Sequence, residues 1–587
     1  MGHVLQHIVM PNLAFGAPEE MYVRLHNDKV HALMSERRLF FDSGGRASFD
    51  TFFNSFTVGA WKIHTVVQDL QLHLRGSGRF VVRLGIRRNG HAQRWLAERV
   101  VTFTPDVDVQ MNVDGWSKLE SGMLYFALEA LEPGSLTGGY FATCTAPQRE
   151  VKLGIVITHF NRKQWVLPAI ERIRGELLSD PLYTGRIKLV VVDNSQNITA
   201  EEAQGITVIP NKNLGGSGGF TRGLLYLKDQ QDFTHCLFMD DDASCETESI
   251  RRIFNFFVFS KTARLAVAGS LLREVEPYRL FEKGAKFIGV CKPLKSGLDM
   301  RRVSDLLFAE LLDDVPDYGA WWFFCFEIKD VIEFAFPFFV RGDDSRFSIV
   351  NKFAITTMNG VSTWGDDFYL KDGPLPQYFD TRYHLLHAAI ILNKSRFSQA
   401  LFVLRTSLFH IISYKYASAQ SVILASYDFS RGPASFLDDM DASNAREKIA
   451  KLGNAEKLSS LDRSKYSVVY RSSAEGWVRK MVRVVTLNGV LLPSFFFKKK
   501  TVFQHKSFRA SFREVFAFQR VYYEYEPLSL GYIAEFKRAK AINLIFKAIC
   551  SSINLLVKHD LICKMYLDAS ESMTSESFWR AVFQGRK

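Results

Sequence analysis

The sequence predicts an α/β, Rossmann-like domain placed between an N-terminal antiparallel β-sandwich and a C-terminal, mainly helical domain. Three changes of pattern along its 587 residues support this prediction. Residues 1–150 alternate polar and apolar side chains, residues 151–395 alternate apolar strands with helices, and residues 396–587 have mostly helical spacing. Hydrophobic residues make up 47% and charged residues 23%, which argues against a disordered chain and favours large buried cores.

The N-terminal region has the pattern of short antiparallel strands. Runs such as FVVRLGIRR (80–88) and MLYFALEAL (123–131) carry the period of two that is typical of half-buried strands. Gly, Asn, Asp and Pro separate the runs, so a sandwich or jelly roll is expected. Such a domain would serve either carbohydrate binding or packing and assembly.

The middle region has the pattern of a parallel sheet. VKLGIVITHF (151–160) and IKLVVVDNS (187–195) are continuous β-branched runs, as expected of strands buried on both faces. A helical stretch separates them, and the strand HCLFMD (235–240) follows a Gly-rich turn and a second helix. Doubly wound domains bind ligands at the carboxyl ends of their strands, so polar residues there are the candidates for chemistry.

The C-terminal region carries nearly all of the net charge of +12. From residue 471 to the end, twenty Lys or Arg stand against nine Asp or Glu, a surplus of eleven. LLPSFFFKKK (491–500) and residues 533–560 set apolar and basic side chains next to one another, which suits a surface lying on an anionic membrane. A solvated basic face over a helical core is the alternative. No recognised motif favours nucleic acid as a partner.

The apolar stretches, the N-terminal pattern and the cysteines indicate the cellular compartment of the protein. No stretch reaches the ~20 uncharged apolar residues that span a bilayer, and the N-terminus lacks the pattern of a signal peptide. The seven Cys are scattered without CxxC spacing, which fits a reducing compartment and supplies no zinc site. A cytosolic multidomain protein is therefore expected.

Three consecutive aspartates, Asp240, Asp241 and Asp242, follow an apolar strand. Their mutual repulsion needs an offsetting cation, and hard carboxylate oxygens favour Mg²⁺ or Mn²⁺. Because alternate residues of an extended strand point the same way, Asp240 and Asp242 are expected to share the ion while Asp241 faces elsewhere. The alternative is an acidic cap for the helix that follows.

Polar residues also follow the neighbouring strands. Asp193 and Asn194 are positioned to accept hydrogen bonds from a ribose or base, and Arg162 to pair with a phosphate. NKNLGGSGGF (211–220) would let the backbone approach a ligand at a helix N-terminus, although it lacks the Lys-Ser/Thr of a P-loop. In this order along the chain, these features predict a nucleotide-sugar site. Its expected donor-binding residues are Arg162, Asp193, Asn194, Asn213, Gly215, Gly216 and Asp241.

Together with GAWWF (319–323), FFVRGDDSRF (338–347) and GVSTWGDDF (360–368), these motifs make the chain resemble the GT-A glycosyltransferases of family 2. More closely, residues 155–385 resemble the galactofuranosyltransferases that extend bacterial galactan polymers. The resemblance implies a GT-A fold for the middle domain, a UDP-sugar donor and a divalent metal cofactor, Mn²⁺ or Mg²⁺.

The resemblance also implies roles for single residues. Asp240 and Asp242 would bind a metal carried on the donor diphosphate, and Asp344 would be the general base for the acceptor hydroxyl. Trp321 and Trp322 would stack on acceptor sugars, unless the pair is simply part of the core. The expected acceptor-binding residues are Trp321, Trp322, Asp343, Trp364 and Asp380.

Three positions depart from the family pattern. Gly365 stands where relatives carry a His that completes the metal shell. Asp366 or Asp367 would supply an oxygen instead, the ion would keep an extra water, or metal binding would be weak. Asp380 replaces an acceptor-side His, and Gly342 replaces a Trp, so the acceptor pocket is expected to be reshaped.

The expected activity is inverting, metal-dependent transfer of galactofuranose from UDP-galactofuranose to a growing lipid-linked polysaccharide of the galactan or O-antigen type. The basic C-terminal region would hold the enzyme peripherally on the inner face of the cell membrane, and assembly into a homo-oligomer is left open. Another sugar, rhamnose or galactopyranose, is the nearest alternative. A non-catalytic carbohydrate-binding subunit of a polysaccharide-assembly complex is the alternative from another class, and Gly365 and Asp380 support it.

Overall fold

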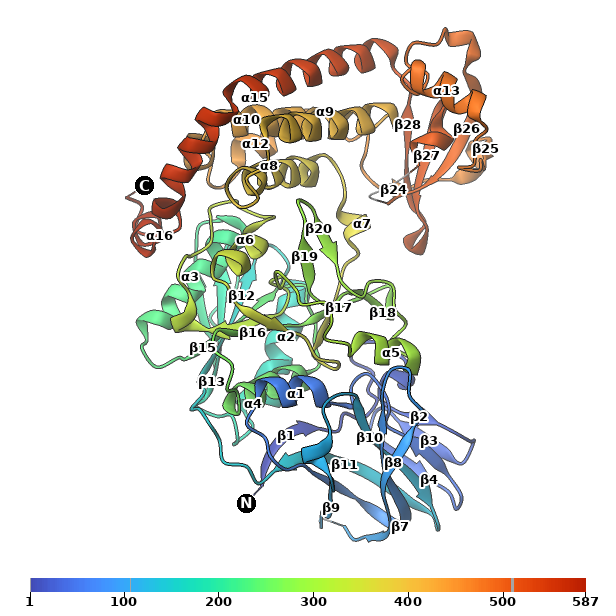
Figure 1. Cartoon of the computed structure of the whole chain (residues 1–587), viewed down its shortest axis with the longest axis vertical. Helices are drawn as coiled ribbons and strands as arrows, with labels where there is room; N and C mark the ends of the chain where they lie inside the picture. Colours follow the sequence, from blue (N-terminus) through green and yellow to red (C-terminus); the bar gives the residue numbers. More distant parts are fainter. Residues whose placement is uncertain (1, 106, 508–510, 587) are drawn as a thin grey trace. The chain divides into compact units, whose positions relative to one another are not determined.

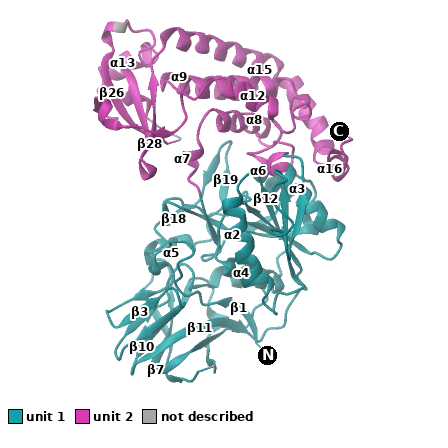
Figure 2. Ribbon diagram, turned by 180° about the vertical axis from the view of Figure 1, so that it is seen from behind, with its two compact units in different colours: residues 1–213, 218–334, 344–365 teal, residues 214–217, 335–343, 366–587 magenta. Residues whose placement is uncertain are grey.

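The structure, a computed structural model, describes residues 2–105, 107–507 and 511–586. These residues form two units, which Figure 2 colours apart. The expected division into three domains stays a prediction, and the N-terminal strands and the α/β sheet belong to the same unit. The first unit holds residues 1–213, 218–334 and 344–365, and the second holds residues 214–217, 335–343 and 366–587.

An antiparallel sheet structure at the N-terminal end of the first unit is built around one long strand, β7 (Gln71–Arg87) (Figure 1). The first half of β7 pairs with β11 (Gly134–Thr143) and the second half with β10 (Met123–Ala130). The change of partner lies near Gly78, whose φ of 96° favours glycine. The antiparallel N-terminal sheet agrees with the period-two pattern. The other elements here are β1 (His3–His7), β2 (Arg24–Leu25), β3 (Val30–Leu33), β4 (Arg38–Phe41), β5 (Arg46–Ser48), β6 (Phe56–Thr57), β8 (Arg94–Phe103), β9 (Val109–Asn112), η1 (Glu19–Met21), α1 (Val58–His64) and η2 (Trp116–Lys118).

A seven-stranded, mixed sheet forms the middle of the first unit, as the Rossmann-like prediction requires. Its strands are β12 (Leu153–His159), β13 (Ile187–Asp193), β14 (Thr207–Pro210), β15 (His235–Asp240), β16 (Leu265–Ala268), β21 (Phe324–Glu327) and β22 (Ala354–Thr356). They lie in the order β14-β13-β12-β15-β21-β16-β22, and only β21 runs antiparallel to its neighbours. The order reverses between β12 and β15, and open α/β sheets bind ligands at such a reversal.

Helices and small sheets complete this α/β region. The helices are α2 (Lys163–Ile173), continued by the π-helical turn η3 (Arg174–Leu178), α3 (Gly215–Asp229), α4 (Thr247–Val258), α5 (Val303–Ala309), η4 (Ile328–Asp330) and α6 (Asp343–Val350). The strands β17 (Ser270–Arg273), β18 (Glu276–Glu282) and β23 (Ser362–Gly365) form one small sheet, and β19 (Ala285–Phe287) and β20 (Cys291–Pro293) form another.

The N-terminal strands brace the segment that follows the three aspartates. The carboxylate of Glu246, just before α4, accepts hydrogen bonds from Asn12 Nδ2 (2.8 Å) and Tyr22 Oη (2.7 Å). The ring of Trp61 meets that of Phe256 edge-on, with centroids 5.0 Å apart. The two parts therefore share one core, and the start of α4 is fixed from the N-terminal side.

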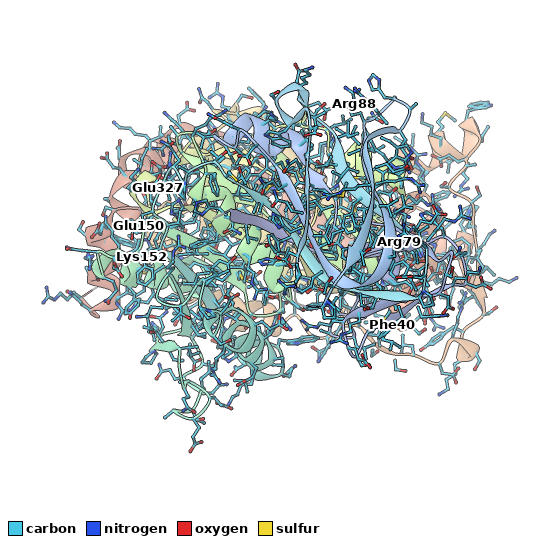
Figure 3. The ribbon with its side chains drawn as sticks, turned by 90° about the horizontal axis from the view of Figure 1, so that it is seen from below. Phe40, Arg79, Arg88, Glu150, Lys152 and Glu327 are labelled. Atoms are coloured by element: carbon cyan, nitrogen blue, oxygen red, sulfur yellow. The ribbon has the colours of Figure 1, made fainter. Side chains whose placement is uncertain are left out.

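The sheet has a second, distant edge, where β12 and β15 begin. Lys152 directly precedes β12, and Glu327 pairs in register with the first residue of β15 (Figure 3). Arg149 Nη1 lies 3.0 Å from the Glu327 carboxylate. This ion pair lies at the start of β15, and Asp240 lies at the opposite end of the same strand.

The second unit combines helices with a sheet that the sequence pattern did not predict. Five strands lie in the order β24-β28-β27-β26-β25, so the C-terminal region is helical only in part. The strands are β24 (Ser459–Ser460), β25 (Val468–Val469), β26 (Lys498–His505), β27 (Phe518–Tyr525) and β28 (Leu530–Glu535). The helical elements are α7 (Phe368–Lys371), α8 (Pro374–Ile390), α9 (Arg396–Ile412), α10 (Tyr416–Ser430), α11 (Ala434–Leu437), α12 (Ser443–Ala450), η5 (Arg463–Lys465), α13 (Trp477–Val485), η6 (Ser494–Phe496), α14 (Phe512–Val515), η7 (Glu526–Leu528), α15 (Arg538–Met573) and α16 (Glu576–Phe583).

Helix α15 is the longest helix of the described residues. By length and composition alone it could cross a membrane, and a third of its most apolar stretch is buried within the protein. One side of α15 packs against α9 and α10, with Leu544, Leu555 and Tyr566 among its buried residues. A core helix of a soluble protein passes the same test of length and composition, so this finding is weak evidence for a membrane span.

Candidate active site

The three aspartates lie at the end of β15 beside the end of β12, where the strand order reverses. Asp241 turns back toward β12: its carboxylate accepts a hydrogen bond from Phe160 N (3.1 Å) and lies 3.3 Å from His159 Nδ1. Asp241 therefore closes the loop between the two strands. This geometry agrees with the alternation that separates Asp241 from Asp240 and Asp242.

Arg162 provides a positive charge at this carboxylate cluster. Its Nη1 donates to Asp242 and lies 3.4 Å from Asp241. Burial would lower the pKa of Arg162, but the charges of the three aspartates outweigh it and raise the pKa. The guanidinium therefore offsets part of the repulsion among the aspartates, which the sequence analysis expected a metal ion to offset.

His159 is a residue of this cluster that the sequence reasoning did not single out. It is fully buried between Asp241 and Asn197, whose Oδ1 lies 3.0 Å from His159 Nε2. Burial lowers the pKa of His159, but its hydrogen bonds with Asp241 and Asn197 outweigh that effect and raise it. In the sequence, the one indication that His159 belongs to the site was its position at the end of a strand, three residues before Arg162.

Asp193 and Asn194 organise the loop after β13. The Asn194 Oδ1 accepts a hydrogen bond from Asn211 Nδ2 (2.9 Å), which ties this loop to the one after β14. Burial raises the pKa of Asp193, but backbone hydrogen bonds outweigh it and lower the pKa. Contact of either side chain with a donor nucleotide stays a prediction. The backbone N–H groups bonded to the Asp193 carboxylate are those of Ser195, Gln196, Asn197 and Ile198, at 2.8–2.9 Å.

The Gly-rich turn opens helix α3 and holds the segment that carries Asp343. Gly215 has a φ of 66°, and a Cβ there would overlap the carbonyl oxygen of Phe339, so only glycine fits. Ser217 N donates to the same carbonyl (3.2 Å), and Ser217 Oγ donates to the Asp343 carboxylate (3.0 Å). Gly216 belongs to the same first turn, and Asn213 precedes it. Their contact with the donor stays a prediction.

Asp343 and Asp344 begin helix α6. Asp343 is buried, whereas Asp344 is partly exposed and its carboxylate accepts a hydrogen bond from Ser345 N (2.7 Å). Glu282 lies close enough to interact with Asp344. Burial first, and then the charge of Asp344, raise the pKa of Glu282 to about 8. At neutral pH, Glu282 is therefore mainly protonated and neutral.

The three tryptophans of the predicted acceptor pocket have different environments. Trp321 is only 5% exposed and its ring packs against three phenylalanine rings. Trp364 is 3% exposed and stacks on Phe15, with centroids 4.6 Å apart, and its Nε1 donates to Pro277 O. Both rings are packed in the core of the structure, and their contact with an acceptor sugar stays a prediction. Trp322 keeps exposed surface, and its Nε1 donates to Gly269 O (3.2 Å). The rings around Trp321 are Phe220, Phe238 and Phe347, with centroids 5.0–5.5 Å away.

Gly365 lies next to the aspartate loop. Trp364 N donates to Ser244 O (2.7 Å), and Ser244 N donates to Trp364 O (3.2 Å), so a β-bridge holds the end of β23 two residues from Asp242. Gly365 has no side chain to offer there. In the second unit, Asp366 lies 3.5 Å from Lys371 Nζ, and its expected role as a metal ligand stays a prediction.

Asp367, the other carboxylate considered as a substitute ligand, is buried in the second unit. Its carboxylate accepts a hydrogen bond of 2.5 Å from Tyr525 Oη of strand β27. This contact gives Asp367 a role in joining the segment before α7 to the unpredicted C-terminal sheet.

Helix α8 carries the acceptor-side substitution at Asp380. The Asp380 carboxylate lies 3.9 Å from Arg341 Nε. Burial raises the pKa of Asp380 by more than the charge of Arg341 lowers it, so the pKa is raised overall. His384 is one turn further along α8; burial and Arg341 lower its pKa to about 3. Gly342 has a φ of 83°, and a Cβ there would overlap the Tyr383 ring. Tyr383 therefore occupies the space that a larger residue at 342 would need.

Asp240 and Asp242 are the residues that would hold a divalent cation. They supply hard oxygen ligands, and the nearby Arg162 marks a position where positive charge is stabilised. Among the described residues, however, no three His, Cys, Asp or Glu are grouped closely enough to hold an ion. The site thus fits a cation shared with an anionic ligand such as a diphosphate, and not one held by the protein alone.

Comparison with known proteins identifies the α/β region. Residues 154–277 match the glycosyl transferase family 2 model. The chain carries a family 2 glycosyltransferase domain. The match runs from β12 to the start of β18 and includes the three aspartates, so the motif-based expectation of a family 2 domain is confirmed for these residues.

Two mycobacterial proteins resemble a longer part of the chain. Galactofuranosyltransferase GlfT2 of Mycobacterium tuberculosis is 26% identical over 431 residues, which are 66% of this chain and 65% of that protein. The protein of the same name from Mycolicibacterium smegmatis is 23% identical over 432 residues, 67% of this chain and 65% of its own. The predicted resemblance to galactofuranosyltransferases is confirmed, and the chain spans about 65% of the length of these relatives.

Similarity to solved structures is low. Mannosyl-3-phosphoglycerate synthase from Rubrobacter xylanophilus is 14% identical and covers 40% of this chain and 74% of its own. The TM-score is 0.25, which is too low for the likeness to support an inference about the glycosyltransferase domain.

Proposed function

We propose that the protein is an inverting, metal-dependent glycosyltransferase that transfers galactofuranose from UDP-galactofuranose to a growing lipid-linked polysaccharide. The observation that carries this proposal is the cluster of Asp240, Asp242 and Arg162 at the strand-order reversal of a family 2 domain. The two mycobacterial galactofuranosyltransferases support the choice of sugar.

Asp344 acts as the general base in this proposal. Its partly exposed carboxylate takes the proton from the acceptor hydroxyl as the hydroxyl oxygen attacks the anomeric carbon. The bond from that carbon to the diphosphate breaks, and its electron pair leaves with UDP. A single displacement of this kind inverts the anomeric centre. Glu282, whose pKa is raised to about 8, is mainly neutral at neutral pH and adds little negative charge beside the base.

The donor diphosphate lies at the carboxyl end of β15 in this proposal. A divalent cation bound by Asp240 and Asp242 would offset the charge of the leaving group. Arg162 exchanges part of its pairing with Asp242 for the diphosphate and contributes one positive charge there. Asp241 and His159 hold the loop in place, because their mutual contact is buried.

The acceptor is proposed to be a saccharide on a lipid, which requires work at a membrane surface. The basic C-terminal region, with twenty Lys or Arg against nine Asp or Glu after residue 470, supports association with an anionic membrane at the cytoplasmic face. Trp322 is the aromatic side chain with exposed surface available for an acceptor ring.

One observation favours a second candidate function. Among the residues that the structure describes, no three His, Cys, Asp or Glu could hold a metal ion, and Gly365 offers no side chain beside the aspartate loop. Both features are expected of a non-catalytic carbohydrate-binding subunit. Transfer of rhamnose or galactopyranose is the alternative within the same reaction class. A donor screen separates these alternatives.

The deciding experiment measures UDP release from UDP-galactofuranose by the full chain, with Mn²⁺, with Mg²⁺ and with chelator. A short galactofuranosyl acceptor on a lipid-like tail is included. We expect metal-dependent release that Asp344→Asn abolishes and that Asp568→Asn, a change at an exposed acid on α15, leaves intact. Donor binding without turnover for every sugar tested would instead support the non-catalytic subunit.

A further inference from the structure

Helix α13 and the turn η6 present apolar side chains to solvent. Trp477 is 75% exposed and Phe495 is 78% exposed, although both are large and hydrophobic. Figure 1 shows α13 beside β26 in the C-terminal sheet region. The exposed apolar residues, called here the α13–η6 surface, are Trp477, Val478, Met481, Val482, Val484, Val485, Leu487, Leu491, Phe495 and Phe496.

Two of the three cations of α13, Arg479 and Arg483, contact the protein, whereas Lys480 is exposed. An ordinary surface helix buries its apolar side instead. Arg483 is buried and donates two hydrogen bonds, of 2.9 and 2.5 Å, to the carboxylate of Glu475. Arg479 Nη2 donates to the backbone carbonyl of Arg513 (2.6 Å). The helix is therefore held by its cations, and its apolar side is left outward.

Neighbouring contacts fix this orientation. Asn488 is buried, and its Nδ2 donates to Ile412 O (2.9 Å) and Phe512 O (3.0 Å). Phe497 stacks on Phe536, with ring centroids 4.4 Å apart. Phe497 is thus anchored, whereas the two phenylalanines before it, Phe495 and Phe496, are exposed.

The exposed charge around the surface is mainly positive. Between Gly476 and Arg513 the sequence contains nine Lys or Arg, of which Arg483 and Lys506 are buried, and no Asp or Glu. Lys480 and the run Lys498–Lys500 are exposed beside the apolar side chains. A large apolar patch rimmed by cations complements acyl chains beneath anionic headgroups, and Trp and Phe are suited to that interface.

We infer that the α13–η6 surface inserts into the interfacial layer of an anionic lipid bilayer. Trp477, Phe495 and Phe496 enter among the acyl chains, and the exposed lysines contact the headgroups. This inference names the surface responsible for the proposed membrane association. It rests on the proposed function only for the membrane that is bound in the cell, because insertion itself requires no sugar transfer. Helix α15 also exposes apolar side chains, and residues 536–559 contain five Lys or Arg and no Asp or Glu. Helix α15 is therefore the competing surface that the test separates from α13–η6.

The test measures flotation of the full chain with vesicles of phosphatidylcholine alone and of phosphatidylcholine mixed with phosphatidylglycerol. No donor sugar is present, so failure of insertion is distinguishable from failure of the proposed transfer. We expect binding to the anionic vesicles only, weakened about tenfold or more by Phe495→Ser with Phe496→Ser. The matched control, Phe546→Ser on α15, removes a 66% exposed Phe and leaves binding unchanged.

A second readout reports insertion directly. Lipids brominated on their acyl chains are expected to quench the tryptophan fluorescence of the wild type, and Trp477→Phe is expected to remove that quenching. Equal binding of the double Phe variant, or loss caused by Phe546→Ser instead, would overturn the inference. So would a decrease in molecular mass of the lipid-free double variant, because a second copy of the chain would then cover the surface.

Discussion

The guanidinium of Arg162, from the loop after β12, donates a hydrogen bond to the carboxylate of Asp242, from the loop after β15. The contact joins the two strands between which the sheet order reverses. It also means that the aspartate cluster already has a counter-charge in the protein, and a metal ion adds to that charge.

Removing that counter-charge should make the protein more dependent on metal. We expect Arg162→Ala to lower the free energy of unfolding by about 1–2 kcal/mol without metal, because Asp242 loses its partner in a partly exposed site. Added Mn²⁺ should then raise the melting temperature more in the variant than in the wild type. Thermal unfolding with Mn²⁺ and with chelator measures both effects. Arg162→Lys, which keeps the charge, is the control, and an equal metal response in all three proteins contradicts the prediction.

A third protein ligand should strengthen metal binding. Gly365 has ordinary backbone angles, and an added Cβ would meet only the Leu271 Cδ1, at 3.1 Å. The β-bridge between Ser244 and Trp364 holds position 365 beside the aspartate loop. We expect Gly365→His to raise Mn²⁺ affinity about tenfold or more, measured by calorimetry. Gly365→Ala controls for the loss of glycine, and an affinity gain shared by both variants would exclude ligation by the new His.

Glu282 should make stability depend on pH. Its pKa rises from 4.5 in the unfolded chain to about 8 in the folded protein, chiefly through burial. The folded state then holds its proton more tightly, so stability is greatest below pH 4.5 and falls as the pH rises toward 8. At about 1.4 kcal/mol per pH unit, the loss approaches about 5 kcal/mol.

Glu282→Gln removes this titration. We expect wild type and variant to unfold at similar urea concentrations at pH 5 and the variant to be more stable at pH 8.5. Glu120→Gln, at an exposed glutamate, should behave as the wild type at both values. A difference between wild type and Glu282→Gln that does not change with pH refutes the raised pKa.

Substitution of Trp321 should mainly reduce stability, whereas substitution of the adjacent Trp322 should mainly reduce acceptor binding. Trp321 packs against three phenylalanine rings, so Trp321→Ala should cost about 3–5 kcal/mol of unfolding free energy. Trp322→Ala should cost about 1 kcal/mol, chiefly the hydrogen bond to Gly269, and raise the acceptor KM with little change in kcat. Chemical unfolding and initial-rate kinetics test the pair. An acceptor KM that rises for a folded Trp321 variant, and not for Trp322→Ala, would reverse the assignment.

Much of the candidate site was predictable because strand periodicity is local. The alternation along FMDDD separates Asp241 from Asp240 and Asp242, and the structure has Asp241 turned back to Phe160 and His159. Strand–helix alternation also placed Arg162 and the aspartates at neighbouring strand ends. Neither argument required knowledge of residues far along the chain.

The role of each tryptophan was not predictable in the same way. GAWWF contains two adjacent aromatic residues, and only the packing of Phe220, Phe238 and Phe347 distinguishes Trp321 from Trp322. These partners come from α3, β15 and α6, so no local pattern contains the answer. His159 escaped notice for the same reason, since its partners Asp241 and Asn197 lie on other loops.

The sequence by itself determined the order of the regions: an antiparallel start, a middle region of alternating strands and helices with three aspartates after a strand, and a basic end. Those features depend on short-range periodicity and on composition. The tertiary structure decided the C-terminal five-stranded sheet and the outward apolar side of α13. Strand pairing and burial are set by partners that are distant in sequence. Examples are Asn488 and Phe497, whose contacts with Ile412 and Phe536 help to leave the hydrophobic side of α13–η6 facing solvent.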